Sequence, residues 1–273
     1  MDSFFLSKSK TMNELKNIFL PNKVLSKTTF GIMVLVQAVI VLLVWFLSNS
    51  VFLPTPVNIF KALGNLINQE SLFFELMTST MLCLQSMLYA IIISLIISYL
   101  TVIPFFRPIA FIISKFRFLT LVGLSFYFAL MTHSGHQLKA SLMTFGITVF
   151  FVTSLVSVIN ATTRNELNHA RTLRMSEWQV VWEVIILGKI DLVFEIIRQN
   201  FAIAWMMLTM VEGISRSEGG IGTLLLNQNK HLRLDSVFAI QLVILAMGIL
   251  MDYLIGLLKN IFCPYATLTT STK

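Results

Sequence analysis

The segment TRNELNHARTLRMSEWQVVWEVIIL, residues 163–187, is the longest polar-containing stretch between two strongly apolar ones. Two helix starts can be recognised in it. Thr163 followed by Glu166, and Ser176 followed by Gln179, have the spacing of a capping box. In that motif a hydroxyl and a second side chain satisfy the free backbone N–H groups at a helix start. The segment is therefore predicted to form two short helices with a turn between them.

Apolar residues recur at helical spacing after each cap, which indicates that one face of each helix is covered. These residues are Leu167, Ala170 and Leu173, and then Trp178, Val181, Trp182 and Ile185. A solvated loop has no need of two tryptophans on one stripe. Three interpretations remain open: the stripe packs onto the chain's own helices, docks into a partner, or lies as an amphipathic loop at a membrane surface.

The composition indicates an integral membrane protein. The chain has 273 residues, of which 56% are hydrophobic and only 12% are charged, and its mean hydropathy is +0.82. A soluble domain usually has about 25% charged residues. No polar interval is long enough to bury a core of its own, so a separate soluble domain is excluded. The net charge of +7 is expected to reflect orientation in lipid, not nucleic-acid binding.

Apolar runs near the ~20 residues that a helix needs to cross a bilayer recur along the chain. We therefore predict an all-α polytopic membrane protein with about six transmembrane helices and a cytoplasmic helical loop, 163–187, between spans four and five. The predicted spans cover about 30–47, 77–102, 118–131, 140–158, 192–211 and 237–258.

Basic residues predict the orientation. With an inside N-terminus, fourteen lysines and arginines fall on the inner side and five on the outer side. The positive-inside rule then places both termini and the central loop in the cytoplasm. The predicted organisation is a cytoplasmic tail over 1–28, a transmembrane domain over 29–262 and a cytoplasmic tail over 263–273. The first 28 residues are too long and too charged for a cleavable signal peptide.

The central loop also carries a family resemblance. Ala170-Arg-Thr-Leu-Arg-Met-Ser-Glu-Trp-Gln179 resembles the "EAA" loop of bacterial ABC importer permeases, in which Glu-Ala-Ala, three residues, Gly and a later Leu-Pro form a helical elbow. The nitrate/sulfonate/taurine branch has Ala-Arg-Thr-Leu-Gly-Ala-Ser-Arg-Trp-Gln at this place. The resemblance implies that the elbow inserts into a cleft on a cytoplasmic ATPase. The implied docking residues are Asn168, His169, Ala170, Leu173, Arg174 and Trp178.

Four positions of the elbow depart from the family pattern. Asn168 stands at the Glu position, His169 at the first Ala, Arg174 at the Gly and Leu187 at the Pro. The family's Gly sits at the turn between the helices, where a positive φ is cheap only for Gly. If Arg174 adopts that conformation, we expect a cost on the order of 1 kcal/mol. The docking surface is then altered, or tuned to one particular ATPase.

Other segments resemble the same family in the same order. They are the turn Leu53-Pro-Thr-Pro56 after the first span, Gly135 with Lys139 before the fourth, Glu212 followed by Gly213-Ile-Ser-Arg-Ser-Glu-Gly-Gly-Ile-Gly222 after the fifth, and Gly248 with Asp252 in the last. Glycines permit irregular backbone where it lines a cavity. Glu212, Gly219, Gly220 and Gly222 are therefore candidates for a translocation pathway, with an ordinary outer loop as the alternative.

The resemblance implies the membrane-spanning subunit of an ABC importer in the bacterial inner membrane. Its partners would be an ABC ATPase, an extracytoplasmic substrate-binding protein, a second permease copy and membrane lipid, with no nucleic acid. No Gly-x-x-x-x-Gly-Lys-Ser/Thr pattern occurs, so ATP would be bound by the separate subunit. The chain would then be no enzyme and carry no cofactor of its own.

Polar residues elsewhere suggest no catalytic or metal site. His133 and His136 share a loop, but a third ligand is not in sight, so a solvated loop is the favoured interpretation. Glu195 and Arg198 are spaced to pair on one helical face or to sit at the interface. Asp252 is expected to face protein or the cytoplasmic interface, because a charge is expensive in lipid.

A second interpretation comes from another class of protein. The missing Gly and Pro of the central loop are also what a non-transporting membrane scaffold derived from such a permease would show. A membrane-embedded enzyme is disfavoured, because no paired carboxylates or clustered metal ligands lie at a common depth.

Overall fold

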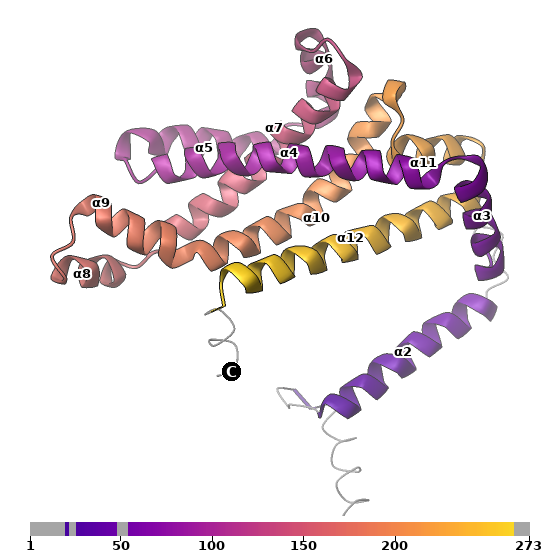
Figure 1. Cartoon of the computed structure of the whole chain (residues 1–273), viewed down its shortest axis with the longest axis horizontal. Coiled ribbons are helices and arrows are strands. Elements are labelled where there is room, and N and C mark those ends of the chain that lie inside the picture. The colour runs from indigo at the N-terminus through magenta and orange to yellow at the C-terminus, as the bar shows by residue number, and fades with distance from the viewer. Residues whose placement is uncertain (1–19, 22–25, 48–53, 265–273) are drawn as a thin grey trace, which may run out of the picture. The chain divides into compact units, whose positions relative to one another are not determined.

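The computed structural model describes residues 20–21, 26–47 and 54–264, and every regular element in that part of the chain is a helix (Figure 1). The chain divides into two units, 1–58 and 59–273. The first unit contains α2 (Lys27–Leu47), which matches the first predicted span. Most of the two predicted tails, and Leu53 of the Leu-Pro-Thr-Pro turn, lie outside the described residues.

The second unit holds the remaining helices, and α3 crosses the boundary between the units. In chain order they are α3 (Pro56–Gln69), α4 (Leu72–Leu100), η1 (Pro104–Phe106), α5 (Arg107–Lys115), η2 (Phe116–Phe118), α6 (Leu121–Met131), α7 (Gly135–Asn160), α8 (Arg164–Thr172), α9 (Glu177–Val180), η3 (Val181–Ile186), η4 (Leu187–Lys189), α10 (Ile190–Ile214), η5 (Arg216–Glu218), α11 (Ile221–Lys230) and α12 (Leu234–Phe262).

Four of the described helices are long and apolar enough to cross a membrane: α2, α4, α7 and α12. A fifth span results if 104–118 and 121–131 are counted together, although the two segments meet at 111°. The fold class is thus confirmed as all-helical and polytopic. The predicted count of about six included α10, which has 25 residues. Its first half carries Asp191, Glu195 and Arg198, and it is not among the four.

The third predicted span, 118–131, differs most from its prediction. Leu119 and Thr120 have extended backbone, with ψ of 135° and 132°, so the helix starts only at Leu121. The 11 residues of α6 reach only about 16 Å, against a hydrocarbon core of about 30 Å. Pro104 and Pro108 stand in the first turns of η1 and α5, where their missing N–H groups are tolerated. The region is therefore a broken pair of short helices.

The core lies where α4 packs on α7. One face of α4 carries small residues at spacings of three and four, each fully buried: Ser79, Cys83, Ser86, Ala90, Ser94 and Ser98. Small side chains let two helix backbones approach closely within a membrane. Ser86 Oγ donates to the Ala140 carbonyl on α7 at 3.4 Å. Phe151 and Leu142 of α7 fill the space beside this face with 1% and 0% exposure.

The two segments that the sequence singled out as candidate sites lie at opposite ends of α10. The segment α8–η4 precedes its first residue, and η5 and α11 follow its last one. The 25 residues of α10 span about 37 Å, so these two ends are a membrane thickness apart. Figure 1 shows α8 and α9 together at one end of the second unit and α11 at the other.

Candidate functional sites

The central loop folds as a helical elbow, with α8 and α9 as its arms. Thr163 Oγ1 accepts a hydrogen bond from the Glu166 N–H at 3.3 Å. Ser176 forms the complete capping box: its Oγ accepts from Gln179 N, and its own N–H donates to Gln179 Oε1 at 2.8 Å. Both predicted helix starts are confirmed. At Thr163 only this half of the capping box forms. The Glu166 carboxylate pairs with Lys189 Nζ at 3.2 Å instead of accepting from the Thr163 N–H.

Arg174 lies at the bend of the elbow with φ of +58°. Arg174 therefore has the left-handed conformation that was considered for this position, where the similar family has Gly. The bend is held by Arg171, whose Nε and Nη2 donate to the two carboxylate oxygens of Glu177 at 2.9 and 3.0 Å. This bidentate bond lowers the pKa of Glu177 below its usual value. Asn168 Oδ1 accepts from Arg171 Nη1 at 3.2 Å and orients the same guanidinium.

The predicted docking residues form a mostly exposed surface on the elbow. Asn168, His169, Leu173, Arg174 and Trp178 are exposed, and of the six only Ala170 is buried. Leu173 and Trp178 keep 61% and 71% of their surface. The structure thus brings these residues together at one end of the second unit.

The predicted apolar stripe of the second arm is divided between two environments. Ile185 is buried, whereas Trp182 is 56% exposed. Trp178, Val181 and Trp182 form one wall of a groove of about 360 Å³, and the last turns of α4 form the other. Packing on the chain's own helices therefore applies to part of the stripe. For the exposed part, docking into a partner and a place at the membrane surface both remain predictions.

The second arm is not a regular α-helix throughout. It is wound as a π-helix over Val181–Ile186 and tightens to a 3-10 turn over Leu187–Lys189. Leu187, at the position of the family's Pro, begins that tight turn. Single π-turns within α-helices are frequent at functional sites. No sequence pattern predicted this change in winding.

At the other end of α10, Glu212 is 1% exposed and its carboxylate is fully engaged. Ser79 Oγ of α4 donates to Glu212 Oε1 at 2.5 Å, and the Gly222 N–H donates to Oε2 at 2.7 Å. Ser79 Oγ in turn accepts from the Ile221 N–H at 2.8 Å. The carboxylate therefore sits against the N-terminus of α11, where free N–H groups and the helix dipole favour negative charge.

The loop before α11 is held from two further helices. Lys139 Nζ of α7 donates to the Gly219 carbonyl at 2.7 Å, and the Gly220 N–H donates to the carboxylate of Glu75 on α4. Lys139 was expected in a polar loop before the fourth span. Instead α7 already starts at Gly135, and Lys139 is 3% exposed. Its ammonium is buried because it finds an acceptor on the loop and three nearby carboxylates, Glu212 of α10, Glu218 of η5 and Glu75 of α4.

Backbone geometry explains why glycines stand at 219, 220 and 222. Gly219 and Gly220 have φ of +68° and +107°, which L side chains rarely adopt. A Cβ on Gly222 would lie 2.6 Å from the Thr209 carbonyl oxygen, so α11 could not approach α10 as closely. The structure brings together all four predicted residues of this segment. The sequence reasoning missed Ser79 and Glu75, although Glu75 is the only acidic residue in α4.

A third polar cluster joins α10 to α12. Arg198 Nε lies 2.7 Å from Asp252 Oδ1 and its Nη1 lies 3.9 Å from Glu195 Oε1. Lys259 Nζ of α12 completes the cluster at 2.8 Å from Glu195 Oε2. The sequence left Glu195 and Arg198 either as a pair or at the interface, and the structure shows them as an ion pair. Asp252 was expected to face protein or the cytoplasmic interface, and it contacts Arg198 of α10. The two positive and two negative charges of this cluster neutralise one another.

Comparisons with known proteins support the architecture. No family model matches the chain, and no curated protein matches it. Among solved structures, it is similar to a chain in the crystal structure of an amino acid ABC transporter with histidines, at a TM-score of 0.56 and 17% identity. The match covers 72% of this chain and 95% of the other. The chain therefore shares the fold of that transporter chain, with several helices long and apolar enough to cross a membrane, and identity this low carries the likeness no further than fold.

Proposed function

We propose that this chain is the membrane-spanning subunit of an ATP-driven ABC importer for a small solute, of the nitrate/sulfonate/taurine-like class. It would reside in the bacterial inner membrane with both termini in the cytoplasm. A separate ATPase would hydrolyse ATP, an extracytoplasmic binding protein would deliver the solute, and a second permease copy would complete the pathway. The permease fold and the order of the family-like segments support this proposal.

The observation that carries the proposal is the exposed face of the elbow. Leu173 and Trp178 remain 61% and 71% exposed at the α8–α9 end of the second unit, on a bend that Arg171 and Glu177 hold in shape. Exposed large apolar residues on a rigid, polar-rimmed segment are typical of a protein-docking surface. A helical elbow of this kind fits a cleft in a partner.

The mechanism would be alternating access. ATP closes the ATPase dimer, the elbows over 163–187 move with it, and the attached helices rock between inward-open and outward-open states. Coupling requires that the ATPase bind the two states with different affinity, because only a differential interaction shifts an equilibrium. α10 joins the elbow directly to Glu212 and the α11 loop, so a displacement at one end has a rigid path to the other.

The test is affinity purification of the tagged chain from its native membranes, with mass spectrometry of the proteins recovered. Leu173→Glu and Trp178→Glu are each expected to abolish recovery of an ATPase while leaving membrane insertion intact. Leu232→Glu is the matched control, because Leu232 is 80% exposed but lies between α11 and α12 at the other end. Unchanged ATPase recovery with both elbow variants would contradict the docking role. If the unaltered chain recovers no ATPase, the scaffold interpretation replaces the importer.

A further inference from the structure

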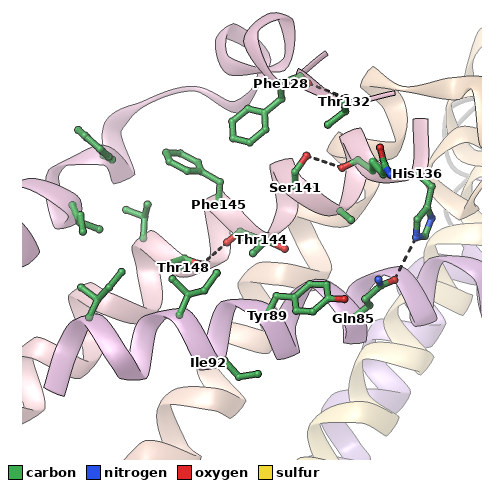
Figure 2. A pocket seen from close by; sticks show the side chains of 17 residues that line it. Gln85, Tyr89, Ile92, Phe128, Thr132, His136, Ser141, Thr144, Phe145 and Thr148 are labelled. Carbon is green, nitrogen blue, oxygen red and sulfur yellow. Dashed lines mark hydrogen bonds between the residues drawn. The ribbon is translucent and has the colours of Figure 1, made fainter. Parts of the chain in front are cut away.

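A large cavity lies beside the α4–α7 core, away from both sites described above. Its volume is about 810 Å³, and its walls come from α4, α5, η2, α6 and α7. Ligand pockets in proteins usually enclose about 300–1,000 Å³. The broken pair α5–α6 creates the space, because its 111° bend holds α6 away from the line of α5. Figure 2 shows side chains from several helices pointing into it.

The end of the cavity near the α6–α7 turn is polar. His136 Nε2 lies 3.3 Å from Gln85 Oε1, which joins α7 to α4 (Figure 2). Within the described part of the chain, the amide nitrogen of Gln85 makes no hydrogen bond, so it can donate to a ligand. The hydroxyl oxygens of Thr132 and Ser141 donate to carbonyls of their own helices and can still accept. This end therefore offers both donors and acceptors.

The rest of the cavity is apolar. Ile92 and Ile97 of α4, Ile113 and Phe116 of the α5–η2 segment, and Phe145 of α7 line it. Among the described residues that line it, none is Asp, Glu, Lys or Arg. A charged head group would find no countercharge among these residues, and an ion in the apolar part would also lose its hydration, which costs several kcal/mol. The lining thus selects against a charged group and favours a hydrocarbon body.

Its size argues against a membrane helix as the occupant. A helix about 10 Å across fills roughly 120 Å³ per residue of length, so 810 Å³ holds about seven residues. A crossing helix needs about 20 residues. A small molecule with a polar group at one end fits both the volume and the gradient from Gln85 to Phe116.

We propose that this cavity is a binding site for an uncharged amphipathic molecule, whose hydrogen-bonding head meets Gln85 and His136 and whose hydrocarbon body lies between α4, α5 and α7. The inference goes beyond the importer proposal and does not depend on it. The same chemistry is available from two sources: an uncharged lipid of the bilayer, or a solute that enters from water.

Photolabelling of the full chain tests the site. The chain is placed in nanodiscs of phosphatidylcholine with diacylglycerol and labelled with a diazirine derivative of decanol. We expect saturable labelling of residues 92–97 and 141–149, competed by decanol but not by decyl sulfate or decylammonium. Ile93→Trp fills the cavity and should lower labelling about tenfold or more. Ile112→Trp is the control, because Ile112 is 55% exposed on α5 and does not line the cavity.

A second variant tests the polar end of the cavity. Gln85→Leu should raise the decanol concentration needed for competition by about two- to tenfold, the size expected when the head group loses one hydrogen bond. Gln241→Leu, on exposed α12 surface, should leave it unchanged. Each variant is first checked for an unaltered helical circular dichroism spectrum, and Ile93→Phe replaces Ile93→Trp if the latter fails that check.

The outcomes separate the two sources. Diacylglycerol retained by the unaltered chain in native mass spectrometry, and lost from the Ile93→Trp variant, assigns the site to a bilayer lipid. Saturable decanol labelling without retained diacylglycerol assigns it to a solute from water. Equal competition by the charged decyl compounds, or labelling that Ile93→Trp leaves unchanged, would overturn the proposal. A failure of ATPase recovery in the earlier experiment has no bearing on either result.

Discussion

At the residue scale, Arg174 stands in a backbone conformation that an L side chain adopts at a cost. Its φ of +58° lies in the left-handed region. The chain keeps the elbow despite the lost Gly because the Ser176 capping box and the Arg171–Glu177 pair hold the bend from both sides. The altered position therefore changes the energy and the exposed surface of the elbow, and leaves its shape in place.

Arg174→Gly should stabilise the isolated chain by up to about 1 kcal/mol, because the left-handed strain of about 1–2 kcal/mol is relieved and part of the gain is offset by the freer unfolded chain. Thermal unfolding in detergent measures this as a higher midpoint. Arg164→Gly is the matched control: Arg164 begins α8, and Gly there should lower the midpoint or leave it unchanged. A midpoint that falls in both variants would show that Arg174 is not strained.

The contact between Glu212 and Ser79 could not be predicted from the sequence. They lie 133 positions apart, yet Ser79 bridges the Glu212 carboxylate and the Ile221 N–H. Serines and threonines are common in membrane helices, where most bond their own helix carbonyls, as Ser94 does with Ile91. Only the packing of α4 against α10 and α11 selects Ser79 for this position.

At the element scale, the approach of α11 to α10 depends on one missing side chain. A Cβ on Gly222 would lie 2.6 Å from the carbonyl oxygen and 2.7 Å from the Cα of Thr209. Both are backbone atoms, so no side-chain rotation can relieve the clash. Close packing without a Cβ also lets the Gly222 N–H reach Glu212.

Gly222→Ala should therefore destabilise the chain by about 1–3 kcal/mol, the usual range for overpacking. Gly64→Ala is the control: nothing lies within 4 Å of its added Cβ inside α3, and Ala there should stabilise the chain by about 0.5–1 kcal/mol. Thermal unfolding of both variants in the same detergent gives the comparison. Equal midpoints for the two variants would contradict the close approach of α11 and α10.

At the scale of the whole molecule, the charge distribution predicts which end faces the cytoplasm. The elbow belongs to the basic inner set, and α11 lies at the far end of α10. Basic residues are retained on the cytoplasmic side during insertion. The two native cysteines, Cys83 and Cys263, are buried, so a new cysteine can report on one side alone.

Asn165→Cys in α8 and Asn229→Cys in α11 form a matched pair at exposed positions. A membrane-impermeant maleimide should label Asn229→Cys in intact cells, and Asn165→Cys only after the cells are broken. The unaltered chain gives the background at Cys83 and Cys263. The reverse pattern would show that the basic elbow faces outward and would leave an ATPase no access to it.

Much of the fold follows from local sequence signals. The apolar runs predict α2, α4, α7 and α12, because a long helix satisfies its own backbone in lipid whatever its neighbours are. The caps at Thr163 and Ser176 predict the arms of the elbow for the same local reason. The positive φ of Arg174 was anticipated only from the Gly that the similar family has at this turn. The broken α5–α6 pair escaped prediction, because an apolar segment has similar hydropathy whether it is straight or bent.

The sequence by itself determined the all-helical membrane class, the capped elbow and the glycine-rich segment after Glu212, because each depends on residues within a turn or two of one another. Only the tertiary structure decided that Ser79, Glu75 and Lys139 converge on that segment, and that a cavity with one polar end opens beside α4 and α7. These features depend on helices far apart in the chain. The register between these helices is set by how their small and large side chains fit together across the helix interface. No local sequence pattern encodes that fit.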